Sequence, residues 1–419
     1  MSLSSLLFLA VLAVLPIQLG KFFWPNYSFV LGIPIDYRAL TLYLSDLVVI
    51  AYLVTFIFEN FKNLSQIFRK RRGIILIFSI LNLYLIINSI FFSISPVASL
   101  IFSLRFLILS FLAVFGSITF SFKRLRAMSF FVIGISLLWQ SILIILQFIF
   151  QRSLGFWFLG ERAFDSSTTN IAHISLFGNQ LLRSYGTFPH PNVASAFLIS
   201  YLLIYIFSLS PDHKIFSNKK WFSTIRILIL LVSLTAIVLT FSKTAILAFG
   251  LFLAIFLKSP KKLFLVALFL VLVIWLFVIQ LKGTQLASIA ERLLLNQAAL
   301  DIALINPLVG VGSNNFILEL SKLDLSSLAE VRLLQPVHDI FLLILAENGV
   351  IGFLIFAILV FVIFKNTHSV FNFGLLVIIL VFASVDHFLW TLQQGQLLLA
   401  ISIGYIVGSK EIVRKSHPR

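Results

Sequence analysis

The sequence predicts an all-α fold, namely a polytopic helical membrane protein with about twelve transmembrane helices. Of its 419 residues, 60% are hydrophobic and only 11% are charged, whereas a soluble domain carries roughly 25% charged residues. Apolar runs long enough to cross a bilayer recur along the whole chain. These runs are continuous rather than alternating in polarity, which excludes a transmembrane β-barrel.

The net charge and the absence of cysteine indicate which partners and which chemistry to expect. The net charge of +16 does not require nucleic acid, because cationic loops of a membrane protein act as topology signals and contact anionic lipid. We therefore expect the lipid bilayer, and no nucleic acid, as a partner. The chain has no cysteine, which excludes disulfides and thiol chemistry.

Twelve apolar segments are predicted to span the membrane. They lie near residues 3–19, 41–58, 74–92, 98–119, 128–150, 191–210, 225–241, 244–258, 263–282, 338–364, 369–386 and 388–408. The first follows no basic region and has no clear cleavage site, so we interpret it as an uncleaved span. Only a short polar break at Asp386 and His387 separates the last two. Because no repeat and no soluble segment is found, residues 1–419 are predicted to form a single integral membrane domain.

The loops between these spans alternate in charge. One set holds 20 of the 31 basic residues but only three acidic ones, Glu59, Asp212 and Glu411. The positive-inside rule places this set, and both termini with it, in the cytoplasm. Two large loops, at about 151–190 and 283–337, are then predicted to face outward.

The second outward loop is predicted to be helical in part. Residues 291–301 and 323–334 show the apolar spacing of amphipathic helices. Gly310 and Gly312 lie between them and permit a tight backbone turn, which is their ordinary role.

The stretch from Arg183 to Asn192 joins the first outward loop to a membrane span. Pro191 has a fixed φ and no amide hydrogen, so a helix is expected to begin there. Its unpaired amides and the positive end of its dipole would then lie at the membrane surface, beside Arg183, His190 and Asn192. Such a helix start is a site for an anion such as phosphate, although Pro191 and Asn192 also suit a plain helix start.

Further polar side chains are predicted on the same outward side. Lys243 lies between the seventh and eighth spans, Arg292 lies in the second loop, and His338 and Asp339 open the tenth span. If these helix beginnings converge, their dipoles and side-chain charges make a site for a diphosphate-sized anion. Plainer roles remain open: Lys243 as an interface anchor, and Arg292 as a partner of Glu291 or Asp301.

Two charged residues are predicted inside spans. Glu347 lies about two turns into the tenth span, where an acid is costly unless it is paired. Arg105 is the same case in the fourth span, and the two form one possible pair. Asp386 and His387 lie at the outer surface, where they either reach the site or only close a loop.

Three stretches together resemble the O-antigen ligase and polymerase superfamily. The first contains Arg183, Gly186-Thr187-Phe188 and His190-Pro191-Asn192. The second is Pro307-Leu308-Val309-Gly310-Val311-Gly312, and the third runs from His338 through Glu347 and Gly349 to Gly352. The resemblance covers an O-antigen ligase-like core at about 183–352.

The resemblance implies a role for each matching residue. His338 would be the general base, and Arg183, Lys243 and Arg292 would bind the substrate diphosphate, with His190, Asn192, Asp339 and Glu347 in support. Lys243 stands where the family usually has Arg, so the charge is kept without the bidentate grip. Asp339 stands where Asn is frequent and would place a negative charge beside the base.

The resemblance also implies a function. We expect a glycosyltransferase of a bacterial inner membrane that moves a glycan from undecaprenyl diphosphate to a glycolipid, glycan or protein acceptor on the extracytoplasmic side. No cofactor and no metal cluster is expected. A polymerase of the same superfamily is an alternative, and a transporter of an anion or a lipid-linked sugar is a competitor from another class.

Overall fold

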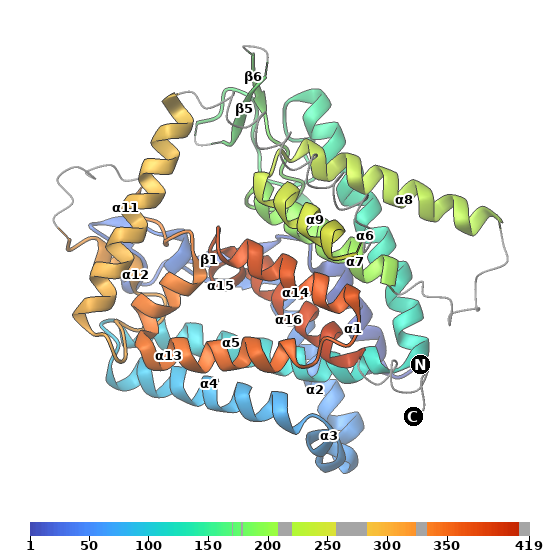
Figure 1. Ribbon diagram of the computed structural model, residues 1–419, viewed down its shortest axis with the longest axis horizontal. Helices are drawn as coiled ribbons and strands as arrows, with labels where there is room; N and C mark the ends of the chain where they lie inside the picture. Colours follow the sequence, from blue (N-terminus) through green and yellow to red (C-terminus); the bar gives the residue numbers. More distant parts are fainter. Residues whose placement is uncertain (170, 177–178, 208–219, 257–282, 324–332, 410–419) are drawn as a thin grey trace.

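The computed structural model describes residues 1–169, 171–176, 179–207, 220–256, 283–323 and 333–409, and it is mostly helical (Figure 1). The helices are α1 (Leu3–Val14), α2 (Leu44–Asn60), α3 (Leu64–Lys70), α4 (Arg72–Phe91), α5 (Pro96–Ser121), α6 (Lys123–Phe150), α7 (Pro191–Phe207), α8 (Lys220–Leu239), α9 (Lys243–Phe256), α11 (Gly283–Ile305), α12 (Phe316–Leu320), α13 (Ile340–Phe364), α14 (Val370–Ala383), α15 (Phe388–Thr391) and α16 (Gln393–Gly408). Short 3₁₀ turns lie at η1 (Asn26–Ser28), η2 (Asp36–Arg38), η3 (Phe61–Asn63) and η4 (Trp157–Leu159).

The predicted polytopic membrane architecture is confirmed, but the count of twelve spans is not. Within the described residues, five helices are long and apolar enough to cross a membrane, at Leu44–Lys70, Arg72–Phe91, Pro96–Ser121, Lys123–Phe150 and Ile340–Phe364. Shorter apolar helices coincide with most other predicted spans, while the span at 263–282 lies outside the described residues. The first span is a helix of only 12 residues, or about 18 Å.

The expectation of a purely α-helical chain is corrected by three antiparallel hairpins. β1 (Gly20–Phe23) pairs with β4 (Leu40–Tyr43), β2 (Phe29–Val30) with β3 (Ile33–Pro34), and β5 (His173–Leu176) with β6 (Asn179–Leu182). Each strand has at most four residues, which is too short for alternation to be recognised in a sequence dominated by long apolar runs. Two of the hairpins fall in predicted loops, whereas β4 takes up the start of the span predicted at 41–58, so that helix begins only at Leu44.

Helix α7 is the innermost helix of the bundle. Every residue from Pro191 to Tyr205 is buried, and the helix packs against α6, α8, α9, α14 and α16. A second layer is formed by α4, α5 and α13, which run side by side along one edge of the molecule (Figure 1). A helix that is apolar on all sides is stable in this position because it is surrounded by other helices.

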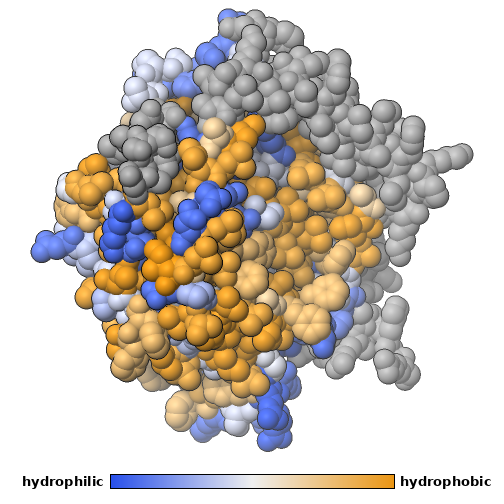
Figure 2. Space-filling view, turned by 60° about the vertical axis from the view of Figure 1, so that its left-hand side comes forward, coloured by the Kyte–Doolittle hydropathy of each residue, from blue (hydrophilic) through white to orange (hydrophobic). Residues whose placement is uncertain are grey.

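The outer surface of the molecule is apolar over much of its area. Figure 2 shows hydrophobic side chains across most of the visible described face, with hydrophilic groups gathered in patches. Exposed examples are Leu83, Phe91 and Ile135, each more than 60% accessible. Such a surface fits contact with lipid tails.

Helix α13 is interrupted at Gly349, which has φ +63° and ψ −173°. The freed backbone groups are satisfied by residues 306–312. The amide of Gly312 donates to Glu347 O (2.7 Å), and the amide of Val350 donates to Pro307 O (2.8 Å). Irregular backbone at membrane depth is stable only when its polar groups find such partners.

Glu347 belongs to this interruption. Its Oε1 accepts a hydrogen bond from the Phe316 amide at 3.1 Å. The possible pairing of Glu347 with Arg105 is wrong, because Arg105 Nη2 pairs with Asp46 Oδ2 at 3.0 Å. The acidic partner of Arg105 therefore comes from the start of α2.

The predicted role of the glycines near residue 310 as turn formers is confirmed. Gly310 has φ +71°, and a Cβ there would come within 2.4 Å of the Glu347 carbonyl carbon. A Cβ at Gly349 would come within 2.3 Å of Leu308. The backbone of residues 306–312 and the backbone of α13 meet at a distance that leaves no room for a Cβ, which explains why each segment has a glycine at the contact.

Replacing Gly349 with alanine should destabilise the fold by at least about 2 kcal/mol, since the change adds backbone strain to a clash with Leu308. Thermal unfolding of the purified protein in detergent would show a lower Tm. Gly73→Ala is the matched control, because Gly73 is helical and has open space around its Cα. This substitution should leave the stability of the protein unchanged or raise it slightly. Equal Tm values for the two variants would contradict the structural role of Gly349.

Candidate functional site

Three helix ends meet at Asn192, the second residue of α7. Its Oδ1 accepts hydrogen bonds from Arg183 Nη2 (3.2 Å) and Ser242 Oγ (3.0 Å), and its Nδ2 donates to Asp386 Oδ2 (2.9 Å). Ser242 directly precedes α9, and Asp386 lies between α14 and α15. The predicted start of α7 at Pro191 is confirmed, and the predicted convergence of α7 and α9 is found.

Asp386 connects this junction to His338, which lies just before α13. His338 Nδ1 is 3.8 Å from Asp386 Oδ1, which is longer than a direct hydrogen bond. The His338 ring also lies 5.2 Å from the ring of His387, and His387 Nδ1 is 2.7 Å from Thr391 Oγ1. The beginnings of α7, α9 and α13 are thus linked through one carboxylate.

The carboxylate of Asp386 is charged at neutral pH. Burial alone would raise its pKa, but the nearby His338, His387 and His190 hold the pKa of Asp386 well below its usual range. A carboxylate beside an imidazole can orient the ring and stabilise the imidazolium that forms when the ring takes a proton.

Arg183 supplies a cation behind this carboxylate. Its Nε donates to Thr240 O at 2.9 Å, and among the described residues no carboxylate lies within ion-pair distance of it. Loss of solvent lowers the pKa of Arg183 to about 10, while Tyr185 and Asp386 oppose the change, so the group stays charged. A cation without an ion pair in an enclosed place is costly, and an anionic ligand would offset that cost.

Arg292 and Lys243 add positive charge nearby. Arg292 Nη1 donates to Val385 O at 3.0 Å, directly beside Asp386. Lys243 is the first residue of α9 and lies within electrostatic reach of Arg183 and Arg292. Arg183, Arg292 and Lys243 therefore lie within electrostatic reach of one another, and such a group of cations suits a diphosphate.

The alternative pairing of Arg292 along its own helix is not found in the described part of the chain. Asp301 accepts a hydrogen bond from Gln297 Nε2 at 3.0 Å, and Arg292 turns to the loop between α14 and α15. Its guanidinium thus belongs to the site rather than to a solvated helix face.

His190 lies at the entrance to α7. Its Nδ1 accepts a hydrogen bond from the Asn192 amide at 3.1 Å, and its ring meets Tyr185 edge-on at 6.2 Å. Accepting at Nδ1 places the proton of the neutral ring on Nε2. Burial lowers the pKa of His190 to about 3, Arg183 acts in the same direction, and Asp386 opposes.

Asp339 and Glu347 lie beside the cluster rather than in it. Asp339 caps α13, because its Oδ1 accepts from the amides of Phe341 (2.8 Å) and Leu342 (3.0 Å). Glu347 holds the loop that fills the break in α13. The carboxylate that approaches His338 therefore comes from Asp386 and not from the adjacent residue in the sequence.

A large open cavity of about 910 Å³ lies in front of the cluster. His190, Arg292, His338, Asp386 and His387 line one side of it. Arg183, Lys243 and Asn192 do not line this cavity and lie behind the first group. The cavity can hold several sugar rings together with a charged headgroup.

The sequence predicts only that Asp386 and His387 lie at the outer surface, and it leaves open whether they reach the site. Their signal in the sequence is a charged pair that interrupts two otherwise apolar spans. That signal does not distinguish a loop closure from a functional pair. The fold decides between them, because both residues line the cavity with His338.

His338, Asp386 and His387 also satisfy the geometry of a possible metal site. One ligand atom from each lies within 4.8 Å of the other two. The expectation that the chain has no metal-ligating cluster is therefore wrong as far as geometry is concerned. Imidazole and carboxylate are common ligands of divalent metals. The three residues come from two loops that are far apart in the sequence.

A comparison with known protein families finds a match that covers several of the residues at this site. Residues 228–357 match the family model of the O-antigen ligase. Over this stretch the chain is similar to the O-antigen ligase family. The matched stretch includes Lys243, Arg292, His338, Asp339 and Glu347, whereas the segment around Asn192 precedes it. No curated protein matches the chain.

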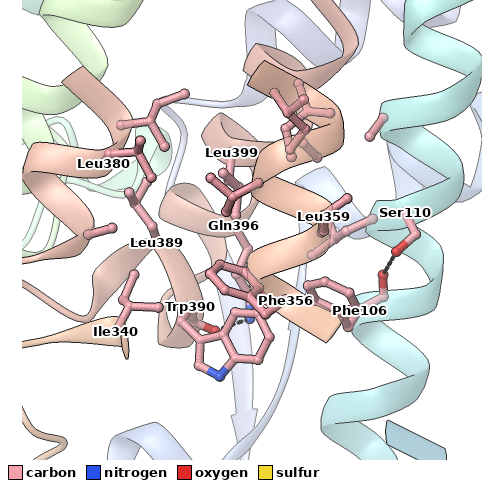
Figure 3. A pocket seen from close by; sticks show the side chains of 18 of the residues that line it. Phe106, Ser110, Ile340, Phe356, Leu359, Leu380, Leu389, Trp390, Gln396 and Leu399 are labelled. Atoms are coloured by element: carbon pink, nitrogen blue, oxygen red, sulfur yellow. Dashed lines mark hydrogen bonds between the residues drawn. The ribbon is translucent and has the colours of Figure 1, made fainter. Parts of the chain in front are cut away.

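A second, narrow and apolar cavity of about 50 Å³ lies next to this cluster. It begins near Ile340 and Leu389, each two residues beyond a histidine of the cluster, and extends to Ile363 and Ile406. Figure 3 shows Phe356, Leu359, Leu389 and Leu399 around this space. Along α16 the lining runs from Gln396 to Ile406, or about 15 Å.

The depressed pKa of His190 predicts acid sensitivity. In the folded protein its pKa is about 3, whereas an unfolded histidine has about 6.5. Between these values unfolding takes up a proton, so stability falls as the pH drops below about 6.5, by up to roughly 1.4 kcal/mol per unit. Unfolding midpoints in detergent at pH 7.5, 6 and 5 would measure the slope.

His190→Asn is the matched variant for this test. Asparagine can accept the Asn192 amide as Nδ1 does, but it does not titrate. Its stability should fall less steeply with acidification than that of the native chain. Identical slopes would show that His190 is not the group responsible.

Proposed function

We propose that the chain transfers a glycan from a polyprenyl diphosphate carrier to an acceptor on the extracytoplasmic side of the membrane. One observation carries the proposal: His338 lies against the Asp386 carboxylate in the wall of a large cavity that it shares with Arg292. A base beside an anion-binding group meets the two needs of sugar displacement from a diphosphate. The similarity to the O-antigen ligase family supports the same substrate class.

His338 acts as the general base in this reaction. The acceptor hydroxyl attacks the anomeric carbon, and its proton passes to the imidazole as the new glycosidic bond forms. Asp386 faces Nδ1, which leaves Nε2 for the hydroxyl and stabilises the resulting imidazolium. The separation of 3.8 Å allows the pair to tighten once substrate is bound.

The leaving group is the polyprenyl diphosphate. The bond between the anomeric carbon and the phosphate oxygen breaks, and the electron pair stays on the diphosphate. Arg292 in the cavity wall, with Arg183 and Lys243 behind it, stabilises the growing negative charge. Asn192 holds Arg183 in register with Asp386 through two hydrogen bonds.

We propose that transfer needs no metal. Three cationic side chains already supply positive charge where the leaving group develops its negative charge. His338 then keeps its imidazole for proton transfer, which a bound metal would block. Transfer that persists in EDTA would support this proposal, and transfer that requires added divalent metal would assign the three residues to a metal site instead.

The apolar cavity suits the prenyl tail of the donor. The cavity begins beside the cluster, at Ile340 and Leu389. The prenyl tail of a donor whose diphosphate lies near Arg292 could therefore enter it. Its lining is almost entirely hydrocarbon, as an isoprenoid chain requires. A charged headgroup site beside an apolar slot fits a lipid diphosphate better than a soluble sugar nucleotide.

The orientation of the chain follows the charge of its loops. The basic set of loops places both termini in the cytoplasm, which directs the cavity and the hairpins to the opposite side. In a bacterium this is the outer side of the inner membrane, where the site would face the periplasm or the cell exterior. Acceptors on that side are glycolipids, glycans or proteins.

Two other functions compete with the ligase reaction. A polymerase of the same superfamily would use a second lipid-linked glycan as acceptor at the same site. A transporter would carry an anion or lipid-linked sugar, but its binding site is expected near the membrane midplane. The cluster instead gathers at helix ends, which favours an enzyme.

Purified protein given undecaprenyl-diphosphate glycan and candidate acceptors should release undecaprenyl diphosphate. His338→Ala should lower this rate by at least about 100-fold, because the base is removed. Arg69→Ala, on α3 and far from the cluster in sequence, serves as a matched surface control. Release of the lipid product, followed by chromatography, measures the rate.

Two outcomes would overturn the proposal. Retained turnover by His338→Ala would dismiss this residue as the base. Movement of the glycan lipid across liposomes, with no release of undecaprenyl diphosphate for any acceptor, would favour the transporter.

Ala400→Phe should obstruct the apolar cavity, because Ala400 lines it at mid-length. We expect the KM for an undecaprenyl donor to rise about tenfold, with little change for a farnesyl donor that does not reach this depth. Ala51→Phe, at an exposed position on α2, is the control. An equal effect on both donors would exclude the cavity as the tail site.

A further inference from the structure

The hairpin formed by β1 and β4 presents two different faces. Side chains alternate along a strand, and the cavity is lined by Phe22, Trp24, Thr41 and Tyr43, which all belong to one face. The other face carries Lys21, Phe23, Leu40 and Leu42, with the last three more than 40% exposed. The hairpin is thus a wall with an apolar outer side and an aromatic inner side.

The inner face forms an aromatic platform. The rings of Phe22 and Trp24 are stacked at 6.0 Å with an angle of 17° between their planes, and Tyr43 meets Phe22 edge-on at 6.3 Å. Phe22 and Trp24 are each 40% accessible. Since both line the cavity, this accessible ring surface is open to a ligand.

A polar corner adjoins the platform. Arg105 lies 5.4 Å from the centre of the Tyr43 ring and pairs with Asp46, and Asp46 also accepts from Gln393 Nε2. Arg105 and Gln393 both line the cavity. The Oε1 of Gln393 is buried and has no hydrogen-bond partner within the described part of the chain, although such an acceptor normally has one.

This combination fits the chemistry of a pyranose sugar. The C–H face of the ring packs on aromatic rings, and its hydroxyls need donors and acceptors at the edge. The unpaired Gln393 oxygen would accept a sugar hydroxyl, and Arg105 would donate. A lipid tail would leave both polar groups unsatisfied, and a phosphate would be repelled by Asp46.

The polar corner formed by Arg105 and Gln393 is connected to the cluster of His338, Asp386 and His387 through contacts that do not involve Arg183. Thr391, two residues before Gln393, contacts His387, and the Tyr37 ring lies 5.2 Å from the His387 ring. Arg183 reaches the same cluster through Asn192 and Asp386. In this chain of contacts the histidines stand between the cations and the hairpin.

We propose that the inner face of the β1–β4 hairpin, with Arg105 and Gln393, is a saccharide-binding subsite that holds the acceptor glycan. The inference rests on the proposed glycan transfer and assigns its acceptor side. Residues 20–46 and 105 lie outside the segment that matches the O-antigen ligase model. This subsite is therefore a feature of the N-terminal part of the chain, and it presents the acceptor hydroxyl to His338.

The test is equilibrium binding of sugar to the full-length protein in detergent. The probe is the lipid-free glycan released by mild acid from the surface polysaccharide of the source cells, observed by saturation-transfer NMR. We expect Trp24→Ala to weaken binding at least about tenfold, and Trp24→Phe to restore most of it. Phe23→Ala is the matched control on the outer face and should bind as the native protein does.

A second arm separates acceptor from donor. Excess farnesyl diphosphate, which occupies the cationic side without a sugar, should leave glycan binding unchanged. Displacement of the glycan by farnesyl diphosphate, absence of binding to the native protein, or equal loss in Trp24→Ala and Phe23→Ala would each overturn the proposal. Tm values for all variants identify any loss that comes from unfolding.

The readout does not depend on turnover. Binding is measured without a donor, so no transfer occurs during the measurement. A failure of the transfer reaction with intact, Trp24-dependent binding would therefore reject the proposed catalysis and keep the saccharide subsite.

Discussion

The hydrogen bond from Asn192 to Asp386 is the constraint on which the site depends. It joins the start of the most deeply buried helix to the loop between α14 and α15, and the same asparagine accepts from Arg183 and Ser242. Through Asp386 the junction continues to His338. Residues separated by almost 200 positions are thereby held in one arrangement, and removing the amide would leave several enclosed polar groups without partners.

The same junction has an electrostatic consequence. Arg183 is enclosed and, within the described part of the chain, has no ion pair, while Arg292 and Lys243 repel it, which costs free energy in the unliganded protein. Active sites commonly keep such unfavourable groups because the ligand provides the missing charge. The cations would then interact most strongly when negative charge develops on the leaving group, which is the requirement for catalysis.

Some of this architecture is readable from the sequence and some is not. The start of α7 at Pro191 follows from the fixed φ of proline, and the membrane class follows from the long apolar runs. The partner of His338 could not be found in this way, because a carboxylate 48 positions away is brought to it only by the packing of α14. Local reasoning favoured Asp339, whose side chain caps α13 instead.

The interruption of α13 at Gly349 is held on both sides by the same loop, residues 306–312. Before the break, Ala346 O and Glu347 O accept from the amides of Val311 and Gly312, and after it the amides of Val350 and Ile351 donate to Pro307 O and Leu308 O. Helices adjust their tilt when bilayer thickness changes. Because both halves of α13 are bonded to residues 306–312, a tilt of the long half would also shift the segment that follows His338, which couples catalytic alignment to the thickness of the bilayer.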